Sequence, residues 1–427
     1  MQPSIANQAV SNLAKNMLVH ETRALLTRLE RVKPFVLYET MVLAAAPSIQ
    51  AQVAIERLLA EGRTRLRGLA YGFLDWLTGP EGQSAPPDEV QRRFAILRLR
   101  FNDVLTQFDV FADVITQRSE RDNGVWLSGL DIVAADALQL PGNYYTAPPL
   151  VCYLRRGHGA AIRRARTRLP GGGESPVAII QIPRERMIGS GIASSLVHEV
   201  GHQGAALLGL DASLHPILRG FQGGRDVQAV VWSFWERWIS EILSDFWSVA
   251  RVGVTSTLGL MGVVSLPRPF VFRVALDDPH PTPWIRVMLS AAIGEALYPD
   301  PQWRTLRAMW EALYPRDGLL PAVARLLAEL ERSIPAFVSV LVNHRPRSLR
   351  GKSLQEVLAG PERTPASLRA YYDTWRGSRL RMQAAPPSLV FAALGQARAD
   401  GRLSPELESR MLSDLLTDWA MRGSLDT

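Results

Sequence analysis

The stretch SLVHEVGHQ, residues 195–203, places His198 and His202 four positions apart, with Glu199 directly after the first histidine. Residues four apart lie on one face of a helix, one turn from each other, so two imidazoles at this spacing can bind the same tetrahedral zinc ion (Zn2+). Glu199 then lies beside the metal without having to ligate it, and its carboxylate can take a proton from a water molecule on the zinc. This H-E-x-x-H pattern predicts a zinc site that activates water. The other interpretation is a pair of core histidines beside a surface glutamate.

A third ligand is expected from an apolar segment that follows, because a catalytic zinc takes three protein ligands and keeps one position open. Glu241 and Asp245 lie four residues apart within WISEILSDFW, so on a helix they share a face. Carboxylates among Trp, Ile, Leu and Phe need a positive partner. We therefore expect Glu241 to ligate the zinc and Asp245 to accept the N–H of a zinc-bound histidine. The alternatives are an exposed acidic edge on an amphipathic helix, or a third ligand at Asp211 or His215.

These motifs together resemble the site of the gluzincin metallopeptidases. HEVGH followed by E-x-x-x-D is typical of that group, and the form EILSD is close both to the thermolysin-like enzymes and to the E-x-x-A-D of the HtpX/Ste24-like peptidases. The segment HPTPWIR, residues 280–286, is similar to the H-P-T-x-x-x-R segment that the latter carry after the glutamate helix. The resemblance covers roughly residues 177–290. The resemblance is limited to the residues of the site, because the HtpX/Ste24-like peptidases have several membrane helices and none is expected in this chain.

The resemblance implies roles for further residues. His280 and Arg286 would line the cleft and help to hold the substrate or the developing oxyanion, and a neutral histidine and an arginine are suitable donors for a tetrahedral intermediate. The resemblance also implies that the apolar strand at 177–182 lies at the edge of the cleft, where an extended substrate can add to it as a further strand. The other interpretation of the His280-Pro281 pair is a turn that starts a helix.

The elements that must position these residues follow from hydrophobic spacing and from Pro and Gly. Apolar residues recur at three and four positions through 4–120, which predicts helices. Three short stretches in 125–185, VWLSGLDIV, PPLVCYL and SPVAIIQIP, are rich in Val and Ile and bounded by Pro and Gly, which predicts strands. The pattern is helical again at 189–210 and over about 226–250, and a long loop is expected between these helices, at about 209–225.

This order of elements predicts an α+β fold that is mainly helical. We expect a zincin-like catalytic core, made of a small sheet and the active-site helix, between helical N- and C-terminal regions. The corresponding domains are 1–122, 123–298 and 299–427. The most apolar stretch, 252–266, falls short of the ~20 residues that span a bilayer. We therefore expect a buried helix or loop there, and no stable membrane insertion.

The composition indicates a folded chain with a dispersed positive charge. The 427 residues are 47% hydrophobic and 21% charged, which is a globular composition. The net charge is +7, and the cations are 45 Arg and 3 Lys spread along the whole chain, whereas a nucleic-acid binder more often concentrates its charge. We therefore expect no nucleic-acid partner. The single cysteine, Cys152, excludes an intramolecular disulfide, and the N-terminus lacks the pattern of a secretory signal, so a cytoplasmic location is expected.

The sequence thus favours a zinc-dependent metallopeptidase with a protein or peptide as substrate. His198, His202 and Glu241 would hold the zinc, and Glu199 would deprotonate the attacking water and hand the proton to the leaving amine. The alternative is a non-catalytic scaffold, in which zinc only pins helices together and the helical ends dock partners. A zinc hydrolase that acts on a non-peptide amide fits the same residues.

Overall fold

The computed structural model describes residues 5–33, 35, 40–155, 159–184, 189–224, 227–275 and 277–425. The fold is mainly helical, with 74% helix and a small three-stranded sheet, which confirms the expected α+β, mainly helical class. The chain divides into two compact units: Met1–Gly124 with Ala165–Val177, and Val125–Arg164 with Ala178–Thr427. The three domains expected from the sequence stay a prediction, because compactness does not show which segments fold on their own.

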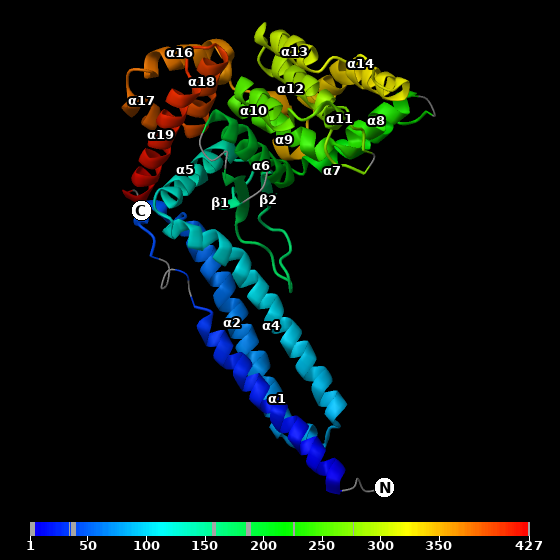
Figure 1. Cartoon of the computed structure of the whole chain (residues 1–427), viewed down its shortest axis with the longest axis vertical. Coiled ribbons are helices and arrows are strands. Elements are labelled where there is room, and N and C mark those ends of the chain that lie inside the picture. The colour runs from blue at the N-terminus through cyan, green and yellow to red at the C-terminus, as the bar shows by residue number, and fades with distance from the viewer. Residues whose placement is uncertain are drawn as a thin grey trace. The chain divides into compact units, whose positions relative to one another are not determined.

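The first unit is built on three long helices, α1 (Ile5–Arg31), α2 (Ile49–Thr78) and α4 (Pro87–Ile115), which lie side by side (Figure 1). Apolar side chains at helical spacing, such as Leu66 and Phe73 on α2, form the core between them. The shorter elements are α3 (Pro80–Ser84) and the 3-10 turns Leu43–Ala45 and Thr116–Ser119. The helices expected in this part of the sequence are confirmed for its described residues.

The second unit holds the sheet, in the order β1-β3-β2. β1 (Leu150–Arg155) and β3 (Ala178–Pro183) run parallel, and β2 (Ala161–Arg163) is antiparallel to β3. β1 and β3 are two of the three strands expected from the sequence, and β2 is an addition to them. Because β3 lies between two strands, it has no free edge where β2 pairs with it. The expectation that a substrate adds to the strand at 177–182 is therefore wrong.

The stretch VWLSGLDIV, expected as a strand, belongs instead to the helix α5 (Arg121–Leu138). Leu127, Leu130 and Ala134 are fully buried at helical spacing, whereas a strand would alternate its buried residues. Val and Ile favour strands only weakly, and packing overrides this preference. The helical spacing of the buried leucines therefore predicts this helix better than the Val and Ile content predicts a strand.

The helices that position the site follow one another closely in the chain. They are α6 (Ser190–Leu208), α7 (Leu210–Gly220), α8 (Val227–Arg237), α9 (Ile239–Val252) and α10 (Val254–Val264). Gly209 ends α6 with a φ of 62°, a left-handed conformation that favours glycine, and the chain turns directly into α7. The loop expected at 209–225 is therefore mostly helix. The single helix expected at 226–250 breaks at Trp238, whose φ of −87° and ψ of 1° leave the helical region.

The remaining regular elements of the second unit are helices and 3-10 turns. They are α11 (Arg268–Val271), α12 (Pro283–Leu297), α13 (Gln302–Leu313), α14 (Pro321–Asn343), α15 (Leu354–Leu358), α16 (Pro365–Trp375), α17 (Arg379–Ala384), α18 (Pro387–Ala399) and α19 (Pro405–Leu425), with 3-10 turns at Arg347–Leu349 and Pro361–Arg363. Several begin with proline, as α12 and α14 do, because the first turn of a helix does not use the missing N–H. Six tryptophans are fully buried in this unit: Trp235, Trp238, Trp247, Trp284, Trp303 and Trp310.

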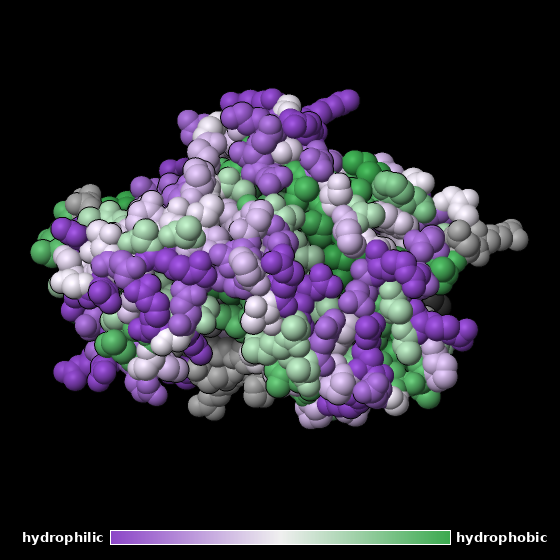
Figure 2. Space-filling view, turned by 90° about the horizontal axis from the view of Figure 1, so that it is seen from above, coloured by the Kyte–Doolittle hydropathy of each residue, from purple (hydrophilic) through white to green (hydrophobic). Residues whose placement is uncertain are grey.

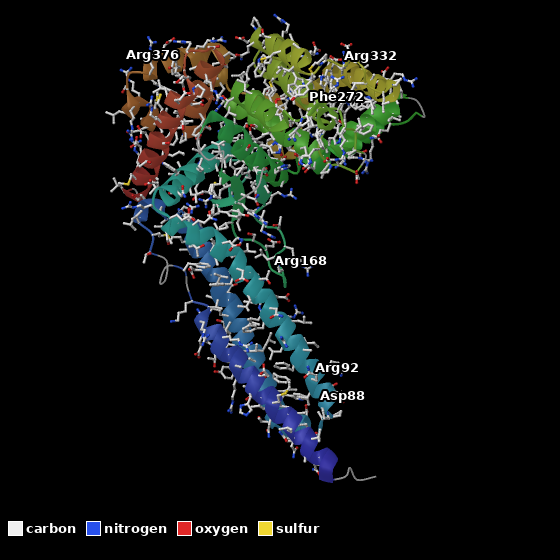
Figure 3. The ribbon with its side chains drawn as sticks, viewed as in Figure 1. Asp88, Arg92, Arg168, Phe272, Arg332 and Arg376 are labelled. Carbon is white, nitrogen blue, oxygen red and sulfur yellow. The ribbon has the colours of Figure 1, made fainter. Side chains whose placement is uncertain are left out.

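Charged side chains are spread over the surfaces of both units. Arg92, Arg168, Arg332 and Arg376 lie on separate parts of the chain (Figure 3), and several arginines form ion pairs, as Arg332 does with Glu329. On the face shown in Figure 2, hydrophilic residues separate the hydrophobic patches. Within the described part of the chain, no helix combines the length and apolar character needed to cross a membrane.

Candidate metal centre

Two glycines let α6 and α9 cross at close range. A Cβ on Gly201 would lie 2.8 Å from the Cα of Ser244 and 2.9 Å from the Cβ of Trp247, and a Cβ on Gly204 would overlap the ring of Trp247. A larger residue at either position would force the two helices apart. The close crossing brings the histidines of α6 against the acids of α9.

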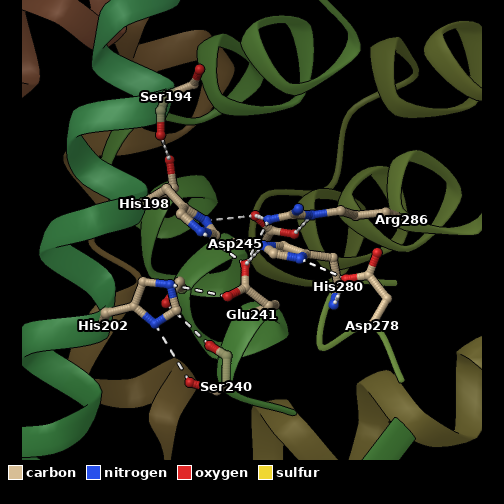
Figure 4. A network of polar contacts seen from close by, with 11 residues as sticks. Ser194, His198, His202, Ser240, Glu241, Asp245, Asp278, His280 and Arg286 are labelled. Carbon is tan, nitrogen blue, oxygen red and sulfur yellow. Dashed lines mark hydrogen bonds and ion pairs between the residues drawn. The ribbon is translucent and has the colours of Figure 1, made fainter. Parts of the chain in front are cut away.

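The three expected metal ligands meet at this crossing (Figure 4). Nε2 of His198 lies 3.2 Å from Oε2 of Glu241, and Nε2 of His202 lies 3.4 Å from Oε1 of Glu241. The two imidazole rings stand edge to face, with centroids 4.9 Å apart. One ligand atom from each of the three residues lies within 4.8 Å of the others. This group could therefore hold a metal ion.

Each histidine is oriented by a contact to its other ring nitrogen. Nδ1 of His198 lies 2.8 Å from Oδ1 of Asp245, and because an ionised carboxylate can only accept, Nδ1 carries the proton. Nδ1 of His202 lies 3.5 Å from Oγ of Ser240. In a neutral imidazole, a proton on Nδ1 leaves the lone pair on Nε2 for a metal. Asp245 thus lies where the sequence predicts it, against one of the two histidines.

Arg286, on α12, binds the carboxylates of α9. Its Nε donates to Oδ2 of Asp245 at 2.7 Å, and its Nη2 donates to Oδ1 of Asp245 at 2.9 Å and to Oε2 of Glu241 at 3.4 Å. The three side chains are largely shielded from solvent, so the arginine offsets the cost of burying two acids. The structure brings Arg286 to the site as their partner, and its contact with a substrate stays a prediction.

His280 lies at the rim of the group, in the segment before α12. Its Nε2 lies 3.4 Å from Oε2 of Glu241. Its Nδ1 lies 2.8 Å from Oδ1 of Asp278, which also accepts the backbone N–H of His280. The side chain of His280 is 52% exposed, so it is the member of this group that a molecule from solvent can reach most easily.

Glu199 lies beside the group without belonging to the three-residue cluster. The residue is only 7% exposed. Burial raises the pKa of its carboxyl above the usual value, and outweighs the opposite effect of the charges on His198 and His202. A carboxylate with a raised pKa binds a proton more readily, which suits a group that accepts and returns one.

The ionisable groups at the crossing shift one another's pKa values in the metal-free protein. Burial lowers the pKa of His198, but its hydrogen bond and charge interaction with Asp245 outweigh burial and raise the pKa to about 9. Burial raises the pKa of Glu241, but its hydrogen bonds with His198 and His202 hold that pKa well below its usual range. For Asp245, burial is outweighed by the charge of Arg286, and the pKa falls to about 2. Both acids are therefore anionic at neutral pH, as Glu241 must be to bind a cation and Asp245 must be to accept the N–H of His198.

The ligand atoms of the three residues are close enough together for one ion to contact them all. Zinc binds imidazole nitrogen at about 2.0–2.1 Å and carboxylate oxygen at a similar distance. The two N–O distances at this site, 3.2 and 3.4 Å, end on different oxygens of Glu241, and one ligand atom from each residue lies within 4.8 Å of the others. Two imidazoles and one carboxylate also suit other divalent transition metals, so the ligand set alone does not select zinc.

The rival third ligands lie outside the cluster. Nδ1 of His215, on α7, lies 3.1 Å from Oε1 of Glu236 on α8. Neither His215 nor Asp211 belongs to the cluster of possible metal ligands among the described residues. Of the candidates that the sequence left open, Glu241 is the one that meets both histidines.

Four residues of the site were not singled out in the sequence: Gly201, Gly204, Ser240 and Asp278. Gly201 is the fourth letter of HEVGH, and a glycine inside a helical pattern can indicate close packing. Ser240 directly precedes Glu241, and Asp278 stands two positions before His280, a spacing at which aspartate commonly binds nearby backbone N–H groups. These patterns are visible in the sequence, but they can be interpreted only once the crossing of α6 and α9 is known.

Comparison of the chain with protein-family models, curated proteins and solved structures finds no match. What this site does is therefore inferred from its residues and their geometry.

Proposed function

We propose that this protein is a zinc-dependent metallopeptidase with a gluzincin-type site. The observation that supports this most strongly is the meeting of both histidine Nε2 atoms at the carboxylate of Glu241, at 3.2 and 3.4 Å. The buried acid Glu199 adds to it, because a purely structural zinc site has no need for an acid beside the metal.

Each residue would have a separate task in this reaction. Zinc held by His198, His202 and Glu241 would supply a Lewis acid that polarises the peptide carbonyl and lowers the pKa of a water molecule. Glu199 would take a proton from the attacking water and pass it to the leaving amine. Its raised pKa lets it keep the proton between the two steps. Asp245 would hold the ring of His198 in the tautomer with a free Nε2.

His280 and Arg286 would support the reaction in different ways. His280 is half exposed at the rim, where it can donate a hydrogen bond to a carbonyl oxygen that gains negative charge. Because Asp278 accepts the Nδ1 proton, Nε2 of His280 can donate only from the doubly protonated ring. Nε and Nη2 of Arg286 already donate to carboxylates, so we infer that Arg286 positions Asp245 and Glu241.

An extended substrate would lie along β2. This strand is an edge of the sheet and packs against α6, so a peptide could pair with its outer side. Ala161 and Arg163 on β2 are exposed. The zincin-like core of the proposal thus consists of this sheet edge, the helix with the two histidines, and α9.

Metal content and peptide cleavage test the proposal together. Purified protein should carry about one zinc per chain, and His198→Ala and His202→Ala should lose it. The zinc-loaded chain should cleave a broad peptide library, a chelator should stop the cleavage, and added zinc should restore it. Full zinc occupancy in either variant would overturn the ligand assignment. A zinc-loaded chain that cleaves no peptide of the library would favour the scaffold, in which zinc only pins α6 to α9.

A further inference from the structure

A groove of about 390 Å³ lies in the second unit between the helices α12, α13 and α14 (Figure 1). α12 packs against both of the other helices. Its contribution to the wall includes Ala292 and Ala296, one turn apart, which leave room that larger side chains would fill. No residue of the candidate metal centre is among the described residues that line the groove. The groove is large enough for a small organic molecule.

The wall that α14 contributes is mostly apolar. Its apolar lining residues recur at the spacing of one helix face, and they are Ile334, Pro335, Val338 and Val342. From Glu331 to Val342 the lined face extends over about 16 Å, at about 1.5 Å per residue. Trp303 on α13 adds an aromatic ring to the wall. An apolar side chain of a bound molecule therefore fits between these residues and α12.

Two arginines of α13 line the groove with guanidinium donors that are not used. Arg304 and Arg307 are three residues apart, so they lie on one face of the helix. Nη1 of Arg304 lies 3.5 Å from Oε1 of Glu295, and Nη2 of Arg307 lies 3.6 Å from Oε1 of Glu331. Both distances exceed those of a hydrogen bond, and neither guanidinium makes one within the described part of the chain. The two guanidinium groups can therefore donate to an anion.

The two acids in the wall differ in how they are paired. Nη1 of Arg316 donates to Oε2 of Glu331 at 2.9 Å, so Glu331 has a partner besides Arg307. Neither oxygen of Glu295 accepts a hydrogen bond from the residues that the structure describes. The side chain of Glu295 lines the groove and is 38% exposed, so a molecule bound there can approach this carboxylate. A cationic donor such as an ammonium group suits it.

Groups of both charges thus lie beside an apolar wall. A ligand with only a positive charge would be repelled by Arg304 and Arg307, and one with only a negative charge would be repelled by Glu295 and Glu331. A ligand that carries both an ammonium and a carboxylate group can pair with both sets.

We propose that this groove binds a zwitterion with an apolar side chain. Arg304 and Arg307 bind its carboxylate, Glu295 binds its ammonium group, and the apolar wall holds its side chain. A free apolar amino acid and a dipeptide of apolar residues both have this chemistry. The site goes beyond the proposed peptidase activity and does not depend on it.

Calorimetric titration of the full chain tests the proposal, and the chain is metal-free because zinc itself could bind an amino acid. The probes are leucine and the dipeptide leucyl-leucine. Their controls are the corresponding amides, which lack the carboxylate, and the N-acetyl derivatives, which lack the ammonium group. At least one probe should bind at least ~10-fold more tightly than each of its controls, as a hydrogen-bonded charge requires. Binding of leucine alone identifies an amino-acid site, and binding of the dipeptide alone identifies a peptide site. Binding of neither probe, or equal binding of a probe and either control, overturns the proposal.

Filling the groove tests its location. Ala296 is partly buried and lines the groove, and leucine is a good helix former, so Ala296→Leu should fold, occupy the groove and abolish binding. The matched control is Ala324→Leu on α14, a partly buried alanine that is not among the lining residues, and it should bind as the wild type does. Wild-type affinity in a folded Ala296→Leu variant would contradict the location of the site.

Charge variants test the two polar contacts separately. Glu295→Gln keeps the size of the side chain and removes its charge, so it should bind the probe roughly 10-fold more weakly and no longer distinguish it from the N-acetyl derivative. The double variant Arg304→Gln and Arg307→Gln should lose the distinction between the probe and its amide. The side chains of both arginines are at least 39% exposed, so this variant should fold. Arg325→Gln, an exposed position of α14 outside the groove, is the control. Wild-type discrimination in either charge variant would contradict the contact assigned to it.

Discussion

Asp245 is the residue on which the geometry of the metal centre depends most. Its Oδ1 accepts the Nδ1 proton of His198 at 2.8 Å, and both of its oxygens accept hydrogen bonds from Arg286. Arg286 holds the carboxylate of Asp245 in position, and that carboxylate orients the ring of His198. The direction in which Nε2 of His198 points therefore depends on a side chain that need not touch the metal.

Replacing Asp245 by asparagine should weaken zinc binding without abolishing it. The amide keeps the size of the side chain but loses the charge that holds the Nδ1 proton, and losses of this kind are typically about 10- to 100-fold. Glu241→Gln should weaken binding more, because it changes a ligand. Competition with a chelator measures both affinities. Glu236→Gln, an acid that binds His215 and Arg219 outside the cluster, is the control. Equal affinity in Asp245→Asn and the wild type would contradict the role of Asp245.

The stability of the metal-free protein should depend on the titration of His198. Its folded pKa is raised from 6.5 to about 9, so the stability it contributes is fully present below pH 6.5 and is lost as the pH rises through 9. The free energy of unfolding should therefore fall by roughly 1–3 kcal/mol as the pH rises from 6.5 through 9. Denaturant unfolding at several pH values measures it. His198→Gln should lack this fall, and an equal fall in that variant would assign it to another group.

At the scale of elements, the site depends on the close packing of α6 against α9 at Gly201. Gly201→Ala would place a methyl group 2.8 Å from the Cα of Ser244. The helices must then separate, so we expect a loss of about 1–3 kcal/mol of stability and weaker zinc binding. Gly72→Ala on α2 has open space around its Cβ and should instead stabilise the chain by about 0.5–1 kcal/mol. Thermal unfolding and zinc titration of both variants check this. A Gly201→Ala variant with wild-type zinc affinity would show that the close approach is not needed.

The sequence predicted most helices of this chain but not where all of them break. Apolar residues at helical spacing located α2, α4 and α6, because packing requires that pattern. The stretch at 125–133 was misassigned because Val and Ile are common in strands, although its leucines follow the period of a helix. The break at Trp238 has no proline or glycine to announce it. It puts Glu241 in the first turn of α9, where the helix dipole favours a negative charge.

At the scale of the whole molecule, the candidate site draws on three segments of the second unit, at 198–202, 240–245 and 278–286. The sequence located each segment through a local motif. Their meeting, the contacts of Ser240 and Asp278, and the central place of β3 in the sheet depend on how distant segments pack, which spacing rules do not determine. The residue types of the site can therefore be predicted from the sequence, whereas its supporting contacts can be identified only once the fold is known.

Whether the molecule is an enzyme or a zinc-stabilised scaffold is decided most directly by Glu199→Gln. The variant keeps the size of the side chain and removes its basicity, and Glu199 lies outside the three-residue cluster. Zinc content and Tm should therefore stay near the wild-type values. Peptide hydrolysis should fall by at least ~10²-fold, because general-base assistance is typically worth about 10²–10⁴. Hydrolysis at the wild-type rate by a zinc-loaded Glu199→Gln variant would contradict the proposed mechanism.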